Sequence, residues 1–336
     1  MNKIYVILFI FIALKIFNVN NVLAQDAQFS QFYAAPLYLA PSFAGATDGS
    51  RVALNYRNQW GLIAGGYNTY SFSYDHYFSN VNSGLGLLFL QDQAGHGNLR
   101  TTNIGLQYSY NLTINRKWSF RPGIHLMYSQ RGVDFYNLKF SDQMVYNTST
   151  SVEIPSEKQI GYIDFSSSAL FFSERNWVGL SVNHMLKPNE SLLGAESNVP
   201  MRYSIFGGTK FSINNRYGKY DEELITPAFI YKTQSEYDQL DIGLYWSKRP
   251  MVIGVWYRGI PGFKKYSSDY VNHDAVAILA GYQLKDLKIG YSYDLTISGL
   301  SSKTGGSHEI SIIYEFLQDK EQQKKRKKVI VSCPKF

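Results

Sequence analysis

The fold is decided by the stretch Thr102-Asn103-Ile104-Gly105-Leu106-Gln107-Tyr108-Ser109-Tyr110-Asn111-Leu112, in which apolar and polar residues alternate. Successive side chains of a β-strand point to opposite faces, so this stretch presents one apolar and one polar surface. Strands of globular domains average about five or six residues, whereas a tilted strand that crosses a bilayer needs roughly 9–11. The stretch is therefore typical of a membrane-spanning strand.

The same alternation recurs along the chain, most clearly at 52–60, 69–78, 288–297 and 309–316. It predicts about fourteen strands, at 50–60, 68–78, 84–92, 101–112, 118–129, 161–172, 176–185, 201–212, 223–233, 238–248, 251–260, 275–284, 287–297 and 307–317. We therefore expect an all-β fold, a transmembrane antiparallel β-barrel that occupies residues 49–317.

The predicted connections alternate in length, as in bacterial outer-membrane barrels, where short periplasmic turns alternate with longer extracellular loops. Arg249–Pro250 is one of the tight turns, and 130–160 is the longest of the loops. Two connections depart from the alternation, since 213–222 is long for a turn and 234–237 is short for a loop. These two leave the count open by two strands.

Residues 1–24 have the features of a secretory signal peptide: Lys3, an apolar core from Ile4 to Leu14, and a small residue, Ala24, at the expected cleavage site. The alternative is an uncleaved anchor, but Lys15 and three asparagines shorten the apolar run below the roughly 20 residues of a spanning helix. After residue 24, no run of consecutive apolar residues reaches about 18, which excludes a helical membrane protein. We expect cleavage near Ala24 and an outer-membrane location.

The net charge of +7 comes from the two ends of the chain. The tail, 318–336, carries seven Lys or Arg against two acidic residues, while 25–316 is neutral. Nucleic-acid binding would require cations on a folded face, so we expect none. Lys324, Lys325 and Arg326 make the tail a candidate docking motif for a periplasmic partner; a plain solvated end is the alternative.

Several strands place polar or charged residues on the face opposite their apolar one. A charge facing lipid at mid-depth costs roughly 2–4 kcal/mol for Lys or Arg, so these residues are expected to line a polar lumen. Pairing within the barrel and transport explain such residues equally well. The candidates are Asn55, Arg57, Gln59, Asp75, Asp241, Asp294 and Glu315.

The sequence has no phosphate-binding loop, dinucleotide-binding glycine set, zinc-protease helix or nucleophile elbow. His76 and His184 fall on apolar faces, most simply as residues of the membrane interface. Cys333 is the only cysteine, which leaves no disulfide framework and no cysteine metal cluster. We expect neither a catalytic residue nor a cofactor or metal site.

The segment 25–48 is the most unusual part of the mature chain. It is rich in aromatic residues, and Pro36 and Pro41 bar it from a central strand or a continuous helix. We expect it to pack at the periplasmic mouth of the barrel, where Phe29, Phe32 and Tyr33 are candidate partner-binding residues. A second aromatic and cationic group, Phe263, Lys264, Lys265 and Tyr266, is a candidate for protein recognition in an outer loop.

This segment, QDAQFSQFYAAPLYLAPSFAGA from Gln25 to Ala46, resembles the opening signature of the PorP/SprF family of type IX secretion system membrane proteins. Ala27 and Ala40 stand where that pattern commonly has proline and asparagine. Further matching stretches are Asn55–Trp60, Tyr70–Asp75, Gly84–Gly95, Asp134–Phe135 and Gly299–Glu309. The resemblance spans nearly all of the mature chain, although no single motif is catalytic or ligand-defining.

The resemblance implies an outer-membrane accessory protein that assists secretion or surface attachment of a large adhesin. The implied partners are outer-membrane lipid, type IX secretion components and the C-terminal domain of a secreted adhesin. A porin or a channel for small or hydrophobic solutes is the alternative, and an outer-membrane hydrolase is a third hypothesis that we do not favour.

Overall fold

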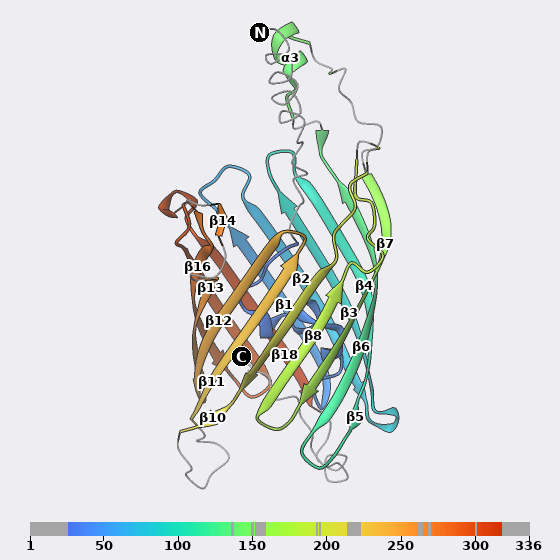
Figure 1. Ribbon diagram of the computed structural model, residues 1–336, viewed down its shortest axis with the longest axis vertical. Coiled ribbons are helices and arrows are strands. Elements are labelled where there is room, and N and C mark those ends of the chain that lie inside the picture. Colours follow the sequence, from blue (N-terminus) through green and yellow to red (C-terminus); the bar gives the residue numbers. More distant parts are fainter. Residues whose placement is uncertain are drawn as a thin grey trace, which may run out of the picture.

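The computed structural model describes residues 26–135, 138–148, 151, 159–192, 194, 196–213, 223–260, 265–267, 270–299 and 301–317 (Figure 1). The predicted signal peptide, the basic tail and the candidates Phe263, Lys264, Lys324, Lys325 and Arg326 lie outside the described residues. For Lys265 and Tyr266 only the backbone is described, in the short strand β14 (Lys265–Ser267), which pairs with β15 (Tyr270–Val271).

Fourteen long strands form the wall of a closed antiparallel barrel, which confirms the predicted fold class and strand count. The strands are β1 (Gly49–Gln59), β2 (Tyr67–Phe78), β3 (Ser83–Ala94), β4 (Leu99–Tyr110), β6 (Ser119–Gly132), β7 (Gln159–Phe172), β8 (Asn176–Asn183), β9 (Arg202–Thr209), β11 (Leu224–Gln234), β12 (Tyr237–Lys248), β13 (Met251–Gly259), β16 (His273–Gln283), β17 (Leu287–Thr296) and β18 (Ser307–Leu317). Two-residue strands, β5 (Leu112–Thr113) and β10 (Phe211–Ser212), follow β4 and β9 after a one-residue break.

The barrel closes because the first and last long strands pair. Each long strand is hydrogen-bonded to the next long strand in sequence, so that β9 pairs with β11 and β13 with β16. The first long strand, β1, pairs with the last, β18, from Gly49↔Leu317 to Gln59↔Ser307. In a bilayer, this pairing keeps the N–H and C=O groups of β1 and β18 from facing hydrocarbon, where each unpaired group would cost several kcal/mol.

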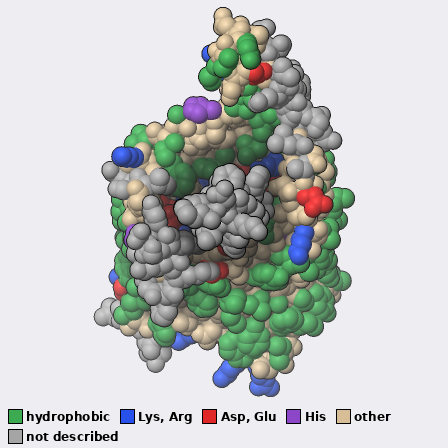
Figure 2. Space-filling view, turned by 45° about the horizontal axis from the view of Figure 1, so that its top comes forward, with side chains coloured by type: hydrophobic (Ala, Val, Ile, Leu, Met, Phe, Trp, Pro, Cys, Tyr) green, Lys and Arg blue, Asp and Glu red, His purple; other side chains and the backbone are tan. Residues whose placement is uncertain are grey.

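The alternation of the strands separates the two surfaces of the wall. On β4, Ile104, Leu106 and Tyr108 are exposed on the outside, and Gln107 and Ser109 are buried on the inside. Figure 2 shows hydrophobic side chains gathered over the outer wall, with charged side chains mainly toward its two ends. The outer surface is thus an apolar belt suited to lipid.

The connections at one end of the barrel are mostly long, and those at the other end mostly short (Figure 1). We call these the long-loop end and the short-turn end. The loop between β6 and β7 contains the helix α3 (Ser141–Tyr146), which Figure 1 shows well beyond the barrel rim. In the described part of the chain, no helix is long and apolar enough to cross a membrane.

Residues 26–48, which we call the plug, lie inside the barrel and run from its long-loop half to the start of β1. They form three short helices, η1 (Phe32–Ala34), α2 (Pro36–Leu39) and η2 (Pro41–Phe43). Pro36 and Pro41 each occupy the start of a helix, where the missing N–H is not needed and the fixed φ is favourable. The plug therefore reaches deeper than the mouth at which the sequence placed it.

Candidate functional site inside the barrel

A single hydrophobic cluster joins the plug to ten of the fourteen long strands. Phe32 packs edge-on against Trp256 at 5.2 Å between ring centroids, and Tyr33 against Trp177 at 5.8 Å. Edge-to-face aromatic pairs at such distances are worth about 0.5–1.5 kcal/mol beyond the area they bury. Because the cluster reaches strands on opposite sides of the wall, the described lumen is a packed core rather than an open pore.

Above this cluster, toward the long-loop end, a network of buried charges holds the backbone of the plug. The carboxylate of Glu309 accepts the N–H of Ser30 at 2.7 Å and the N–H of Gln31 at 3.0 Å. Gln31 in turn donates through its side-chain amide to the Glu309 carbonyl at 3.0 Å. We call this group, with Arg57, Arg258, Asp241 and Asp294, the Glu309 network.

The hydroxyl of Ser30 lies at the centre of the Glu309 network. It donates to Asp294 Oδ2 at 2.6 Å and accepts from the Arg57 guanidinium at 2.8 Å and from the Arg258 guanidinium at 2.7 Å. Arg57 also pairs with Asp294 at 2.8 Å and with Glu309 at 3.2 Å. Breaking a buried pair by removing one partner typically costs about 3–5 kcal/mol, so this network fixes the plug firmly.

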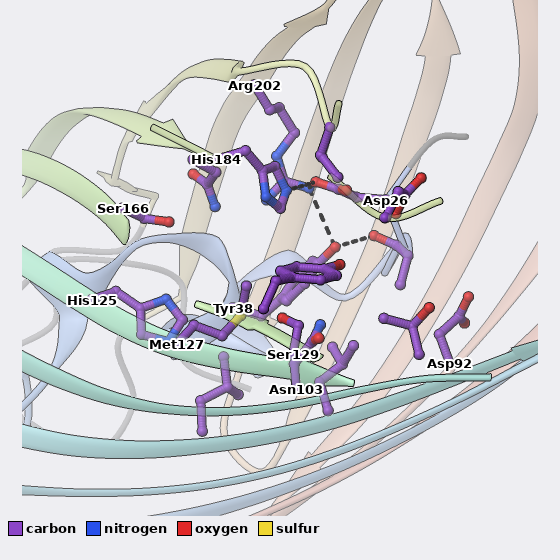
Figure 3. A pocket seen from close by; sticks show the side chains of 18 of the residues that line it. Asp26, Tyr38, Asp92, Asn103, His125, Met127, Ser129, Ser166, His184 and Arg202 are labelled. Atoms are coloured by element: carbon purple, nitrogen blue, oxygen red, sulfur yellow. Dashed lines mark hydrogen bonds and ion pairs between the residues drawn. The ribbon is translucent and has the colours of Figure 1, made fainter. Parts of the chain in front are cut away.

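A second group of charges, which we call the Asp26 cluster, holds the first described residue of the plug (Figure 3). Asp26 Oδ2 lies 2.6 Å from Arg202 Nη1 and 2.9 Å from His184 Nε2. The other ring nitrogen of His184, Nδ1, lies 2.6 Å from Asp164 Oδ2. The Arg202 guanidinium also stands over the ring of Tyr38, 5.5 Å from its centroid.

The charges of the Asp26 cluster shift the pKa values of its members. Burial alone would lower the pKa of His184, but the nearby carboxylates of Asp26 and Asp164 outweigh burial and raise it to about 9. Burial would raise the pKa of Asp26, whereas His184 and Arg202 together hold it well below its usual range. His184 is therefore a cation, and Asp26 an anion, across the physiological pH range.

Close backbone contact fixes the other end of the plug near the short-turn end. Asp75 Oδ2 accepts the N–H of Gly45 at 2.8 Å, and Asp75 is paired with Arg51 at 2.8 Å. Gly45 has φ +63°, and a Cβ on Gly84 would lie 2.1 Å from the carbonyl oxygen of Ala44. Glycine at both positions therefore lets the plug lie directly against β2 and β3.

A cavity of about 110 Å³ lies between the plug and the inner faces of β3, β4, β6 and β7. Leu37, Leu88 and Met127 line it together with polar groups, among them His125 and Asn103 (Figure 3). The paired groups Asp26 and His184 form another part of its wall. Within the described residues, no group of three His, Cys, Asp or Glu is placed to hold a metal ion.

All seven candidate lumen residues lie on the inner face of the wall, and most are paired there. Asn55 donates to the Ala34 carbonyl at 3.3 Å, and Gln59 accepts from Arg57 at 3.3 Å. Asp241 lies 3.4 Å from Arg258, and Glu315 lies 2.7 Å from Lys288. Arg57 and Asp294 belong to the Glu309 network, and Asp75 holds the lower plug.

The candidate partner-binding residues Phe29, Phe32 and Tyr33 are buried inside the barrel. Their contacts are made with Tyr38, Trp256, Trp177 and Tyr245 of the same chain. In this arrangement their aromatic surface is not available to a separate protein. The physical reason is that the plug lies inside the wall and buries its apolar side chains there.

His184 is placed differently from the expectation that it lies at the membrane interface. It follows β8 directly, and its backbone is left-handed, with φ +58°. The alternation of a strand does not extend through such a residue, so the ring turns into the Asp26 cluster. Sequence reasoning also missed Asp26, Asp164 and Arg202; for the last two, strand alternation was the signal that would have found them.

Four of the stretches that carry the family resemblance meet in this interior. The opening signature supplies Ser30 and Gln31, and the stretch Asn55–Trp60 supplies Arg57. The stretch Gly299–Glu309 supplies Glu309, and Tyr70–Asp75 supplies Asp75. Ser30 and Glu309, 279 positions apart in the chain, are thus joined in one network.

In a comparison with protein families, the family described as type IX secretion system membrane protein PorP/SprF matches residues 21–314. No curated protein matches this chain.

Among solved structures, the outer membrane protein Omp33 of Acinetobacter baumannii is 8% identical, with a TM-score of 0.43, over 81% of this chain and 100% of that chain. The toluene transporter TbuX of Ralstonia pickettii is 8% identical, with a TM-score of 0.46, over 84% and 92%. The KdgM porin is 12% identical, with a TM-score of 0.35, over 79% and 99%. These likenesses concern the barrel fold alone.

Proposed function

The chain belongs to the PorP/SprF family of type IX secretion system membrane proteins, and on that premise we propose that it acts in the outer membrane through protein–protein contacts. In this proposal it is an accessory component that assists secretion or surface attachment of a large adhesin. Its partners are type IX secretion components and the C-terminal domain of the adhesin. The long-loop end faces outward, and the basic tail, 318–336, faces a periplasmic partner after signal cleavage near Ala24.

The observation that carries this proposal is the packed interior. In the described residues, a hydrophobic cluster connects the plug to ten long strands, and this packing disfavours free diffusion of solutes through the barrel. Several of the inward charges hold the plug and others pair with each other across the wall, which favours pairing over transport as their role. A barrel whose lumen is occupied by a plug acts through protein contacts on its surface rather than by passing solutes.

The alternative function is a channel for small or hydrophobic solutes. The cavity beside the plug, with its mixture of Leu37, Leu88 and polar groups, is the observation in its favour. Such a function requires the plug to move, because the hydrophobic cluster lies between this cavity and the short-turn end.

The two functions are separated by a deletion strain and by the purified protein. We expect the deletion strain to lose the adhesin from its surface while its uptake of nutrients stays normal. The purified protein in planar bilayers should show little steady conductance. Normal adhesin display together with steady conductance of the wild-type protein would contradict the proposal and favour the channel.

A further inference from the structure

The barrel wall has one strand that continues beyond its neighbour. β7 is paired with β6 along its whole length, from Gln159 to Phe172, but with β8 only from Ser167 to Phe172. Figure 1 shows β7 extending past β8 toward the long-loop end. Among the residues that the structure describes, no strand covers the edge of β7 from Gln159 to Phe165 on the side of β8.

The ladder between β7 and β8 ends because the chain turns after Asn183. His184 and Lys187 both have left-handed backbones, with φ +58° and +47°, and the N–H of Lys187 bonds back to the His184 carbonyl at 3.1 Å. The last bond across to β7 is donated by Met185 to the Phe165 carbonyl at 3.0 Å. The turn that carries His184 into the Asp26 cluster thus also uncovers β7.

The backbone groups at this edge can be identified from Phe165. Its N–H donates to the carboxylate of the neighbouring Asp164 at 2.8 Å, and its C=O accepts the N–H of Met185. Alternate residues of a strand direct their N–H and C=O groups to the same side, so Ile163 and Gly161 point theirs at the same edge. Across the described ranges, neither residue has a backbone partner there. Both are exposed, Ile163 by 59%.

Beyond Asp164, toward the long-loop end, the edge lacks the features that normally protect a free strand. Proteins cover such edges or place Lys, Pro or inward charges on them, because an open edge is a template for another chain. The stretch Gln159-Ile160-Gly161-Tyr162-Ile163 has no Lys, Pro or charged residue. The inward charge next to it, Asp164, protects only the N–H of Phe165. The edge lies at the upper limit of the apolar belt, since Ile163 pairs with the exposed Tyr128, and the next outward pair is Gly161 with Gln130.

We propose that the edge of β7 at Gln159–Ile163 is a docking site for an extended segment of the secreted polypeptide, which adds to the sheet as a strand. The inference rests on the proposed function. Alternate N–H and C=O groups at strand spacing are satisfied by another extended backbone, the basis of recognition by strand addition. The tail of this chain is a poor occupant, because β18 ends at the opposite, short-turn end.

Cysteine cross-linking tests this proposal with the full-length barrel in a Cys333→Ser background. The probe is the purified C-terminal domain of the adhesin that the deletion strain fails to display, with single cysteines at successive positions. Ile163→Cys should form cross-links with cysteines at every second position of one segment of the domain, because the side chains of an added strand point alternately toward and away from it. The matched control is Tyr70→Cys, an outward residue near the same end of β2, which is paired on both sides.

A second pair of variants tests the backbone itself. Ile163→Pro removes the edge N–H and should weaken binding of the domain at least tenfold, whereas Ile163→Val keeps the amide and should bind as the wild type does. Resistance of the folded barrel to unfolding in detergent verifies that both variants are folded.

The outcomes are distinguishable. If the domain binds but Ile163→Cys cross-links no more than Tyr70→Cys, or without alternation, strand addition is overturned and the proposed function stands. Cross-linked dimers of the barrel through Ile163→Cys would assign the edge to a second copy and overturn the proposal. Normal adhesin display in the deletion strain would remove the proposed function and this inference with it.

Discussion

At the scale of single residues, Glu309 holds the plug most directly, because its two carboxylate oxygens accept the N–H groups of Ser30 and Gln31. In Glu309→Gln, the amide places a donor against one of these N–H groups, and Arg57 loses one of its two carboxylate partners. We expect a loss of about 3 kcal/mol of unfolding free energy, measured as a lower melting temperature in detergent.

The matched control for this variant is Glu174→Gln, an exposed residue in the turn between β7 and β8. Surface substitutions of this kind usually change stability by less than about 0.5 kcal/mol. Equal melting temperatures for Glu309→Gln and Glu174→Gln would show that the Glu309 network does not hold the plug.

His184 gives the barrel a pH dependence whose sign follows from its pKa. The pKa is raised from 6.5 to about 9 in the folded protein, so protonation of His184 stabilises the fold. This contribution, at most about 3 kcal/mol, is fully present below about pH 6.5 and is lost as pH rises through about 9. Melting temperatures between pH 6 and 9.5 should therefore fall in the wild type and fall less in His184→Gln.

The control for the pH series is His96→Gln, which alters an exposed histidine in the loop after β3. It should retain the wild-type pH dependence. If His184→Gln and His96→Gln behave alike across this range, the Asp26 cluster is not the source of the dependence.

At the scale of elements, the outward face of β4 tests the membrane assignment. Leu106 is 65% exposed at the middle of β4. Arg at a lipid-facing position near mid-depth costs about 2–4 kcal/mol, so Leu106→Arg should unfold at lower denaturant in lipid vesicles. Ile114→Arg, in the turn after β5, should not, and equal losses for the two variants would contradict the assignment of this face to lipid.

The contact of the plug with β3 depends on a glycine. A Cβ atom at Gly84 would lie 2.1 Å from the carbonyl oxygen of Ala44, and only a shift of the backbone would relieve this clash. Overpacking of this kind costs typically about 1–3 kcal/mol, so we expect Gly84→Val to lower the melting temperature and to loosen the plug, measured as faster proteolysis of 26–48.

Gly299→Val is the control for this contact, because a Cβ on Gly299 meets no atom within 4 Å. It should leave both the melting temperature and the proteolysis of the plug unchanged. A Gly84→Val barrel that behaves like Gly299→Val would mean that the plug does not lie against β3.

At the scale of the whole molecule, the plug is held at separate places, so the lumen should open only when more than one hold is lost. The Glu309 network and the Asp26 cluster use different residues of the plug. We expect Glu309→Ala or Arg202→Ala alone to conduct little in planar bilayers, and the double variant to show steady conductance. The double variant Glu174→Ala/Arg175→Ala, in an exposed turn, is the control, and a closed Glu309→Ala/Arg202→Ala barrel would contradict this account.

The barrel and its fourteen strands were predictable because each strand carries its own signal. Alternation is a local property, and in β4 it assigns Leu106 and Gln107 to opposite faces without reference to any other strand. The candidate lumen residues could be selected in the same way. Their pairing could not, since Arg57 meets Asp294 and Glu309 only after more than 230 intervening residues have closed the wall.

The depth and the contacts of the plug could not be predicted from the sequence. Its two prolines and its aromatic residues predicted packing against the barrel, but its irregular backbone has no period from which depth or contacts follow. His184 shows the same limit at one residue, because a left-handed backbone after β8 reverses the direction that alternation assigns to its ring.

The sequence by itself determined the all-β class, the number of strands to within two, and the face of the wall to which each strand residue belongs, because side-chain direction in a strand depends only on position along it. Tertiary structure alone decided that residues 26–48 lie in the lumen, that Glu309 and Asp26 hold them, and that, among the described residues, no strand covers one edge of β7. Those features depend on distances between segments that are remote in the chain, which no local pattern contains.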